Sequence, residues 1–544
     1  MSVLRSNRNV DHIHLLSDTS SSSSENDGLL RFEDHSNDQS EPDVADYEAA
    51  ITASSYGKFH YWFLFVCGWA NAADAVEVLC ISFLLPSAQC DLRLTSVDKG
   101  WLTAILFIGM LVGGYIWGTL GDSFGRKRVL IAAMLVNAFC GFFSSLAQEK
   151  IVFFVFRFLS GVGVGGSIPI VWSYFAEFQP KSRRGGMLSF LAAFWMVGNV
   201  VVAGIAWLVI PADIGYNTDD PNEFEYNSWR IFVLICGLPA LLVAFGLCWF
   251  PESPKFLLSK GEEKAALKVF AHVFAMNTGQ PSSMYPVKRV VMDYDSPLTG
   301  RLRTSMASFF RDVGNNLHVC FSGRLAKVMI LMLYINFAIQ FGYYGLWLWF
   351  PELFNKLNIY YQTHNETMSV CQVTELDNLD IDDGNGDEFC TGTKPEAEVF
   401  INSFIISLAA LPGNIWTIWH MDKLGRKFFL VLSMVLSGLS VFCIYLVKTE
   451  TANLIVSCLF GLVSTMGFNA LDCLGIELFP SHVRSTAMGI TLVAARLGAI
   501  LGNVIFGYFL ETNCAIPVLA VAILLVSGGL VSILLPNTTK TPLA

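Results

Sequence analysis

The segment GDSFGRKR occupies Gly121–Arg128, and a close variant of it, MDKLGRKF, occupies Met421–Phe428. A second pair of segments lies at nearly the same separation: FAEFQPKSRRG at Phe175–Gly185 and IELFPSHVRST at Ile476–Thr486. Two matched pairs with one offset are typical of a duplicated unit. The sequence therefore predicts a protein built from two related halves.

Both halves are strongly apolar. The 544-residue chain is 53% hydrophobic and only 15% charged, a composition unlike that of a soluble domain. About twelve segments approach the roughly 20 apolar residues that a helix needs to cross a bilayer. They lie near residues 59–86, 101–120, 129–147, 151–175, 188–210, 230–250, 327–351, 397–420, 428–447, 453–475, 486–510 and 515–535. We predict an all-α membrane protein of twelve transmembrane helices in two pseudo-symmetric six-helix bundles.

Short basic loops between the apolar segments predict the topology. Lys and Arg gather at 126–128, 181–184 and 426–427, and the positive-inside rule places such loops in the cytosol. With an even number of spans, both termini are then cytosolic. Basic clusters also occur in nucleic-acid-binding proteins, but their spacing between apolar spans favours topology, so we expect no nucleic-acid partner.

The spans divide the chain into five parts. The polar N-terminal segment holds the run SDTSSSSSEN and has the composition of a disordered tail. The expected parts are a disordered cytosolic tail (1–57), an N-terminal bundle (58–252), a cytosolic linker (253–325), a C-terminal bundle (326–535) with a luminal loop (352–396), and a cytosolic C-terminal tail (536–544).

The tail contains two acidic dileucine patterns, one ending at Leu15-Leu16 and the other at Leu29-Leu30. Clathrin adaptors read this pattern, and two matches in one cytosolic tail favour sorting to vesicles or endolysosomes over chance. The plasma membrane is the alternative location. Clathrin adaptors are therefore expected partners.

The predicted luminal loop has features of an oxidising compartment. It contains a glycosylation sequon at Asn365 and two cysteines, Cys371 and Cys390, for which we predict a glycan and a disulfide. Cys90 and Cys514 also fall near luminal ends of spans and form a competing pair.

Three motifs together resemble those of the major facilitator superfamily of transporters. The first is G-x-x-x-D-x-x-G-R-K at Gly118–Lys127, the second is R-x-x-x-G-x-G-x-G at Arg157–Gly165, and the third is PESPKFL at Pro251–Leu257. The resemblance covers nearly all residues after about 55. It implies alternating access by a monomer. GVGVGG at Gly161–Gly166 also matches a dinucleotide fingerprint, but inside a span close helix packing is far more frequent.

Within that superfamily, three stretches resemble the synaptic vesicle glycoprotein 2 family: Asp74–Ala88, Phe341–Leu353 and Phe468–Ser481. The resemblance implies a vesicle membrane. It also keeps a second function open, namely a transporter-like protein that acts mainly by protein binding and regulation of vesicle trafficking or exocytosis.

The repeated basic loop is a candidate gate. Asp122, Arg126 and Lys127 in the first half correspond to Asp422 and Arg426 in the second. Breaking such ion pairs is one way to release an inward gate. A simple tight basic turn explains the composition of the loop equally well.

Charged residues inside the spans are the candidate substrate or proton site. Asp74 and Glu77 are three apart, so they share one helix face, and intramembrane charges usually face the bundle interior. The resemblance implies that they meet Arg157, Asp472 and Arg496 in the central cavity. A structural ion pair of Asp74 or Glu77 with Arg157 or Arg496 remains the alternative.

Aromatic residues are expected to surround those charges. Trp207, Tyr343, Tyr344, Trp349 and Phe468 match positions of the family's ligand pocket, and aromatic faces stack on rings or hold cations. Ordinary core packing is the alternative, and for Trp349 an interfacial belt is equally consistent with its place in the span.

These observations favour a secondary active, proton-linked transporter of a small polar or charged organic solute. We find no HExxH, G-x-S-x-G, Walker lysine or Cys–His metal spacing in the sequence. We therefore expect neither an enzyme nor a bound cofactor or metal.

Overall fold

The computed structural model describes residues 44–536 except 213, 217–223, 292–314, 316, 365–366, 377–394 and 481–482. The described residues belong to one compact unit, residues 43–544. Within the described ranges, twelve helices are long and apolar enough to cross a membrane, as predicted. The dileucines Leu15-Leu16 and Leu29-Leu30, the sequon residue Asn365 and Cys390 lie outside the described residues, as does the side chain of Asp422.

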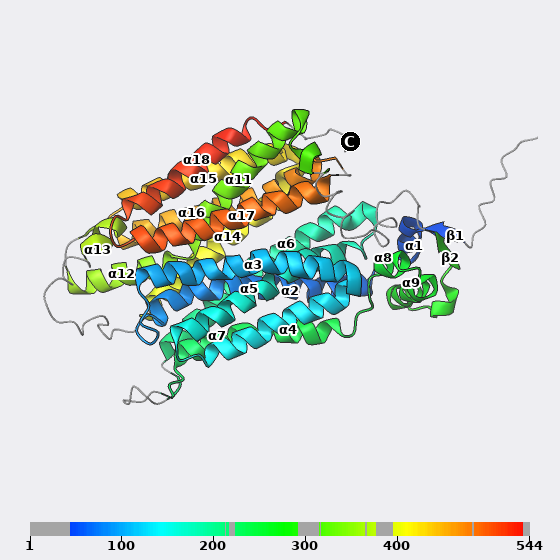
Figure 1. Ribbon diagram of the computed structural model, residues 1–544, viewed down its shortest axis with the longest axis horizontal. Coiled ribbons are helices and arrows are strands. Elements are labelled where there is room, and N and C mark those ends of the chain that lie inside the picture. Colours follow the sequence, from blue (N-terminus) through cyan, green and yellow to red (C-terminus); the bar gives the residue numbers. More distant parts are fainter. Residues whose placement is uncertain are drawn as a thin grey trace, which may run out of the picture. The chain divides into compact units, whose positions relative to one another are not determined.

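The first six spans form one bundle, drawn in blue to green in Figure 1. Its helices are α2 (Lys58–Ser87), α3 (Ser96–Phe124), α4 (Arg126–Ser145), α5 (Lys150–Ala176), α6 (Lys181–Val209) and α7 (Ser228–Leu247). Helices α3 and α4 pack on α5, and α2 packs on both α6 and α7. A short 3-10 turn, Ile210–Ala212, extends α6.

The last six spans form the second bundle, drawn in green to red (Figure 1). Its helices are α11 (Gly323–Trp347), α14 (Ala397–Leu424), α15 (Arg426–Leu446), α16 (Glu450–Leu478), α17 (Arg484–Phe509) and α18 (Ala515–Ser532). Helix α11 packs on α17 and α18, and α15 packs on α16 and α18. The predicted duplication therefore corresponds to two bundles.

The seventh span is longer than predicted. It is continued by α12 (Phe350–Thr363) and followed by α13 (Val370–Leu376), so the expected loop at 352–396 begins with helical residues. Pro351 explains the error, because it lies in the first turn of α12, where a proline costs no hydrogen bond.

The predicted pairing of the luminal cysteines is wrong. Cys371 of α13 is bonded to Cys514, at a sequence separation of 143, and Cys90 is also disulfide-bonded. This excludes both Cys371–Cys390 and the alternative Cys90–Cys514. The physical reason is the fold of α12 and α13, which carries Cys371 to the residue that precedes α18.

The repeated basic loop owes its glycine to backbone geometry. Gly125 joins α3 to α4 with φ 104°, and Gly425 joins α14 to α15 with φ 93°. Residues with a Cβ avoid this region of the map. The motif therefore recurs because both bundles need the same tight turn.

Small residues on α5 allow close helix packing, as predicted for GVGVGG. A Cβ on Gly161 would overlap the carbonyl oxygen of Leu106 on α3, and one on Gly163 would come within 2.9 Å of the Asn137 nitrogen on α4. Glycines on successive faces thus bring α3 and α4 against α5, which is the use that small residues have in membrane helix pairs.

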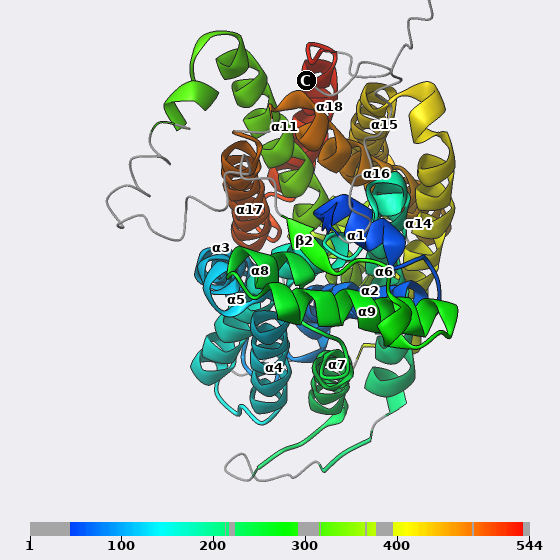
Figure 2. The same cartoon turned by 90° about the vertical axis from the view of Figure 1, so that its right-hand side faces the viewer.

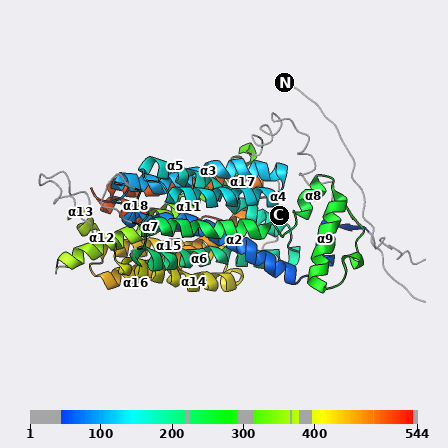
Figure 3. The same cartoon turned by 90° about the horizontal axis from the view of Figure 1, so that it is seen from below.

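The chain before and after the first bundle forms a small cap. Strand β1 (Val44–Asp46) pairs in parallel with β2 (Arg289–Val291), and α1 (Tyr47–Ala53) lies near α9 (Glu263–Thr278) (Figures 2 and 3). Helix α8 (Pro254–Ser259) and the 3-10 turn Ser282–Met284 complete it. Apolar side chains on both sides, including Ile51, Phe270 and Phe274, form one cluster. The prediction of disorder up to residue 57 is therefore wrong from residue 44 onward, because an amphipathic partner lies beyond the first bundle.

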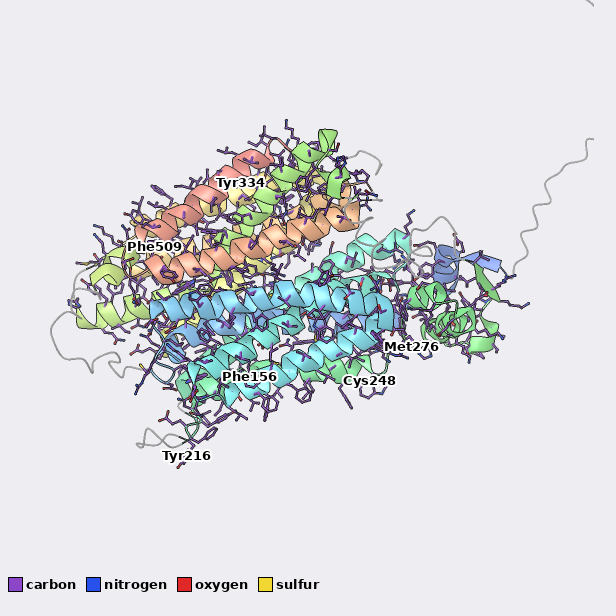
Figure 4. All side chains as sticks on the ribbon, in the orientation of Figure 1. Phe156, Tyr216, Cys248, Met276, Tyr334 and Phe509 are labelled. Atoms are coloured by element: carbon purple, nitrogen blue, oxygen red, sulfur yellow. A yellow bond between two sulfur atoms is a disulfide. The ribbon has the colours of Figure 1, made fainter. Side chains whose placement is uncertain are left out.

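The two ends of the spans differ. We call the end with the basic turns and Cys248 the basic end, and the end with Cys514 and Tyr216 the disulfide end (Figure 4). The bundles contact each other through α3 with α17, α6 with α14, and α2 with α12.

Four glycines show how α3 and α17 are arranged. A Cβ on Gly100 would lie 2.8 Å from the Gly507 Cα, at the disulfide end. Gly118 and Gly489 lie about five turns away on the same helix faces, and a Cβ on either would meet no atom within 4 Å. The two helices thus touch at the disulfide end and diverge toward the basic end.

Candidate functional site

Asp74 and Glu77 lie on one face of α2 and are 0% and 1% exposed. Two carboxylates within one apolar span are unusual. In the structure the two carboxylates have different partners.

Glu77 belongs to a buried ion pair. Its Oε1 lies 2.9 Å from Arg157 Nη1 on α5, and the Ser160 hydroxyl donates to the same oxygen. Arg157 is 0% exposed, donates from Nη2 to Ser144 Oγ at 3.1 Å, and lies over the Phe153 ring. All of these residues belong to the first bundle. Glu77 and Arg157 therefore match the structural alternative that the sequence left open.

Asp74 has a hydroxyl and no cation as its partner. Ser167 Oγ lies 2.7 Å from both carboxylate oxygens, and among the described residues no ion pair to Asp74 is found. Burying a carboxylate without a cation is costly. Asp74 is thus the carboxyl group of this pair whose charge is least compensated.

A second group of predicted residues lies between the bundles. Tyr343, Tyr344 and Phe468 pack together, with ring centroids 4.8 Å apart for Tyr343 and Phe468. Arg496 interacts with the Tyr344 hydroxyl and with Asp472. Phe107 of α3 completes the group, because its ring lies 4.8 Å from Tyr344 and 6.0 Å from the Arg496 guanidinium.

Asp472 is the exposed member of this group. The Asp472 side chain is exposed, whereas the Arg496 side chain is buried. Since both residues lie near Tyr344, Asp472 faces open space near the contact between the two bundles. The five predicted residues Tyr343, Tyr344, Phe468, Asp472 and Arg496 are therefore brought together, whereas the partners of Asp74 and Glu77 lie on α5.

A small pocket lies where the bundles meet. Its lining comes from α2, α6, α14 and the α11–α12 junction: Leu79, Ser82, Phe83, Asn199, Val202, Trp347, Phe350, Pro351, Ser403, Ile406 and Ser407. The polar groups of this lining are hydroxyls, one amide and one indole. The charged residues predicted for the site are not among them.

Two buried polar groups from different bundles meet beside this pocket. Asn199 is 1% exposed, and the buried Tyr343 hydroxyl lies beside it. Neither Asn199 Oδ1 nor that hydroxyl has a partner with hydrogen-bond geometry among the described residues. A buried polar group without a partner costs stability. The Tyr343 hydroxyl and the Asn199 side chain therefore interact with each other across the contact of the bundles, without an ideal hydrogen bond between them.

The other two predicted aromatics do not line the cavity. Trp349 is fully buried, donates to Asn503 Oδ1 at 3.1 Å and stacks on Phe506. Trp207 is partly exposed, and its ring centroid lies 5.8 Å from that of Phe404 on α14. Trp349 therefore packs inside the second bundle, and Trp207 lies at the contact of α6 with α14.

The predicted gate residues form ion pairs at the basic end. In the first bundle Arg126 lies 2.5 Å from Asp122 and 3.7 Å from Glu177. In the second, Arg426 lies 3.1 Å from Glu477. Burial raises the pKa of the Glu177 carboxyl, even though Arg126 opposes this shift. The ion pair between the basic turn and the glutamate is therefore repeated in both bundles.

The two lysines of the basic turns also have matching partners. Lys127 Nζ donates to the Cys248 carbonyl, and Lys427 Nζ donates to the Leu535 carbonyl. Each lysine thus ties its turn to the chain that follows the last helix of its own bundle. Each copy of the duplicated motif thus stabilises its own bundle.

Asn199 and the serines of the pocket were not among the residues predicted for the site. Asn199 was visible as a single amide within the apolar run LAAFWMVGNVVVAG. Polar side chains inside a span frequently mark a functional site. The predicted site residues were charged or aromatic, and the uncharged Asn199 was therefore not included.

Two six-span bundles with a pocket where they meet are typical of the transporter class of multi-pass membrane proteins. Residues 43–346 match the family described as sugar (and other) transporter, and residues 394–543 match the major facilitator superfamily. Human synaptic vesicle glycoprotein 2A is 32% identical over 90% of this chain and 79% of its own. Mouse synaptic vesicle glycoprotein 2C is 30% identical over 90% and 80%.

The chain belongs to the major facilitator superfamily and, within it, to the synaptic vesicle glycoprotein 2 family. Solved structures of the E. coli xylose transporter XylE share the fold. One of them, in a partially occluded inward open conformation, has a TM-score of 0.64 and 17% identity, and the match covers 89% of this chain and 99% of the other. A second, inward open structure has a TM-score of 0.64 and 18% identity, with 89% and 98% covered.

Proposed function

We propose that this protein is a secondary transporter that moves a small polar organic solute across a vesicle membrane by alternating access. The observation that carries the proposal is the meeting of two buried polar groups, the Asn199 amide and the Tyr343 hydroxyl, beside a pocket between the bundles. A transporter must bind its solute where both bundles can reach it. Asn199 belongs to the first bundle and Tyr343 to the second.

The chemistry of the lining favours an uncharged solute with several hydrogen-bonding groups. Ser82, Ser403 and Ser407 supply hydroxyls, and Trp347 supplies an aromatic face. The match to the sugar transporter family model supports this class. An organic cation or zwitterion would instead use Asp472 and Arg496, which lie outside the lining.

Asp74 is the proposed proton carrier. Its carboxyl group has the Ser167 hydroxyl as a partner, whereas Glu77 is paired with Arg157. Gain of a proton removes a poorly compensated charge from the bundle, and loss of the proton restores it. A xylose relative of the same fold is described as a proton symporter, which supports coupling of this kind.

The location and partners of the protein form part of the proposal. Its relatives are named as synaptic vesicle glycoproteins, which supports a vesicle membrane. We propose that the dileucines recruit clathrin adaptors and that the transporter works as a monomer. The alternative function is a vesicle protein that acts mainly through protein partners. The names of the relatives support it, but no contact in the pocket does.

Uptake by reconstituted vesicles separates the two functions. The purified protein is first screened for thermal stabilisation by neutral polyols, sugars, organic cations and zwitterions. Each stabilising compound is then tested for uptake with and without a pH gradient. Uptake of a neutral polar compound that is accelerated by the gradient supports the proposal. Binding without uptake under either condition supports the alternative.

A further inference from the structure

A buried ion pair joins the two bundles at the disulfide end. Lys99 Nζ on α3 lies 2.5 Å from Glu352 Oε1 on α12, and both side chains are 1% exposed. Lys99 Nζ also donates to Gln89 Oε1 at 2.8 Å. This pair differs from the ion pairs at the basic end, where Arg126 and Arg426 each bind a glutamate of their own bundle.

The pair lies at the place where the bundles are closed. Gly100, the next residue of α3, makes the close approach to Gly507. Ser82 Oγ of α2 donates to the Leu348 carbonyl at 2.8 Å across the same contact. Pro351, which precedes Glu352, lines the cavity. The ion pair therefore stands between the cavity and the disulfide end.

The energetics of the pair make it suited to a contact that opens. Charges that are removed from water need each other, and the second carboxylate oxygen of Glu352 has no partner among the described residues. When the bundles separate, water solvates both groups and replaces the lost attraction. An apolar contact has no such compensation, because its separation exposes apolar surface.

We propose that Lys99 and Glu352 form a latch that holds the disulfide end closed and that must part before the cavity opens to that side. The proposal rests on alternating access, the proposed function, and concerns its regulation. Its test measures the distance between the bundles and needs no solute, so failure of the latch and failure of transport are distinguishable.

The decisive variant is Lys99→Met with Glu352→Gln, because it removes the attraction without leaving a buried charge unpaired. Spin labels are introduced with unnatural amino acids at Leu146 and Asn513, which are exposed at the disulfide end of the first and second bundles. This leaves the native cysteines intact. Distances are measured by pulsed electron resonance in lipid nanodiscs.

The latch predicts that the long-distance population rises roughly tenfold in the double variant. The charge-swapped variant Lys99→Glu with Glu352→Lys should restore a short distance. The matched control is Lys150→Met, which breaks the pair with Asp98 at the same end but within the first bundle. It should resemble the wild type.

If the double variant does not fold, Glu352→Gln alone is measured, since glutamine has nearly the same shape and still accepts from Lys99. It should shift the population in the same direction. Distance distributions that match the wild type in whichever of these variants folds would overturn the latch. An equal shift with Lys150→Met would overturn it as well.

Discussion

Glu77 and Arg157 form an ion pair inside the first bundle, at 2.9 Å, while Asp74 on the same face of α2 contacts the Ser167 hydroxyl. The difference divides two carboxylates that look alike in the sequence. Both connect α2 to α5, but Glu77 pairs with a cation there and Asp74 with a hydroxyl; we propose that Asp74 carries the proton.

Glu77→Gln should destabilise the protein strongly, because it leaves the Arg157 guanidinium buried without a counter-charge. The expected loss in the free energy of unfolding is about 3–5 kcal/mol. Asp74→Asn should cost about 1 kcal/mol or less, since an amide still accepts from Ser167. Denaturant titration of both purified variants measures the difference. Equal losses for the two would show that Asp74 is as structural as Glu77.

The Cys371–Cys514 bridge should appear in a non-reducing digest as a peptide that joins α13 to the start of α18. Replacing Cys514 by Ser should lower the free energy of unfolding by about 4 kcal/mol, because a loop of this length gains much freedom when it is opened. Recovery of Cys371 linked to Cys390 by mass spectrometry would contradict the structure.

The turn glycines should tolerate no side chain. Gly125→Ala and Gly425→Ala each force a Cβ into a backbone conformation with positive φ, which costs about 1–2 kcal/mol. At Gly125 the new atom would also meet the Glu252 carboxylate. Gly118→Ala is the matched control, since its Cβ meets no atom, and its melting temperature should equal that of the wild type. A drop at Gly118 as large as at Gly125 would sink this account of the motif.

The N-terminal strand and helix should stabilise the cap at the basic end. Tyr47 donates to the Glu177 carbonyl at 2.6 Å, and Glu48 lies 2.6 Å from Arg184. Deletion of residues 2–53 should therefore lower the melting temperature and increase proteolysis within α9. Deletion of residues 2–43, which retains β1 and α1, is the control. Identical behaviour of the two deletions would mean that the segment contributes nothing.

Some of this structure follows from the sequence because its causes are local. Apolar length predicts the spans, the repeated turn predicts the two bundles, and the glycine stripe near Gly161 predicts tight helix packing. Each of these patterns acts through a few neighbouring residues. They were sufficient for the fold.

The pairings did not follow, because they depend on how distant segments meet. Four cysteines near one end allow three connectivities, and Cys371 found Cys514 only because α12 and α13 are helical. Lys99 and Glu352 look like ordinary interfacial charges at span ends. From the sequence, Trp349 could equally be a ligand contact, an interfacial belt residue or a core residue. Its hydrogen bond to Asn503 on α17 identifies it as a core residue.

The central claim is that Asn199 and Tyr343 bind a solute between the bundles. Its most direct test is the thermal stabilisation of Asn199→Ala and Tyr343→Phe by a compound that stabilises the wild type, with uptake of that compound measured beside it. Each variant should keep a melting temperature close to that of the ligand-free protein, because each removes only weak polar contacts, and should lose roughly tenfold or more in apparent affinity. Trp349→Phe should keep its affinity, because the Trp349 ring packs on Phe506 and is not part of the pocket lining. Unchanged affinity and uptake in both cavity variants would contradict the account.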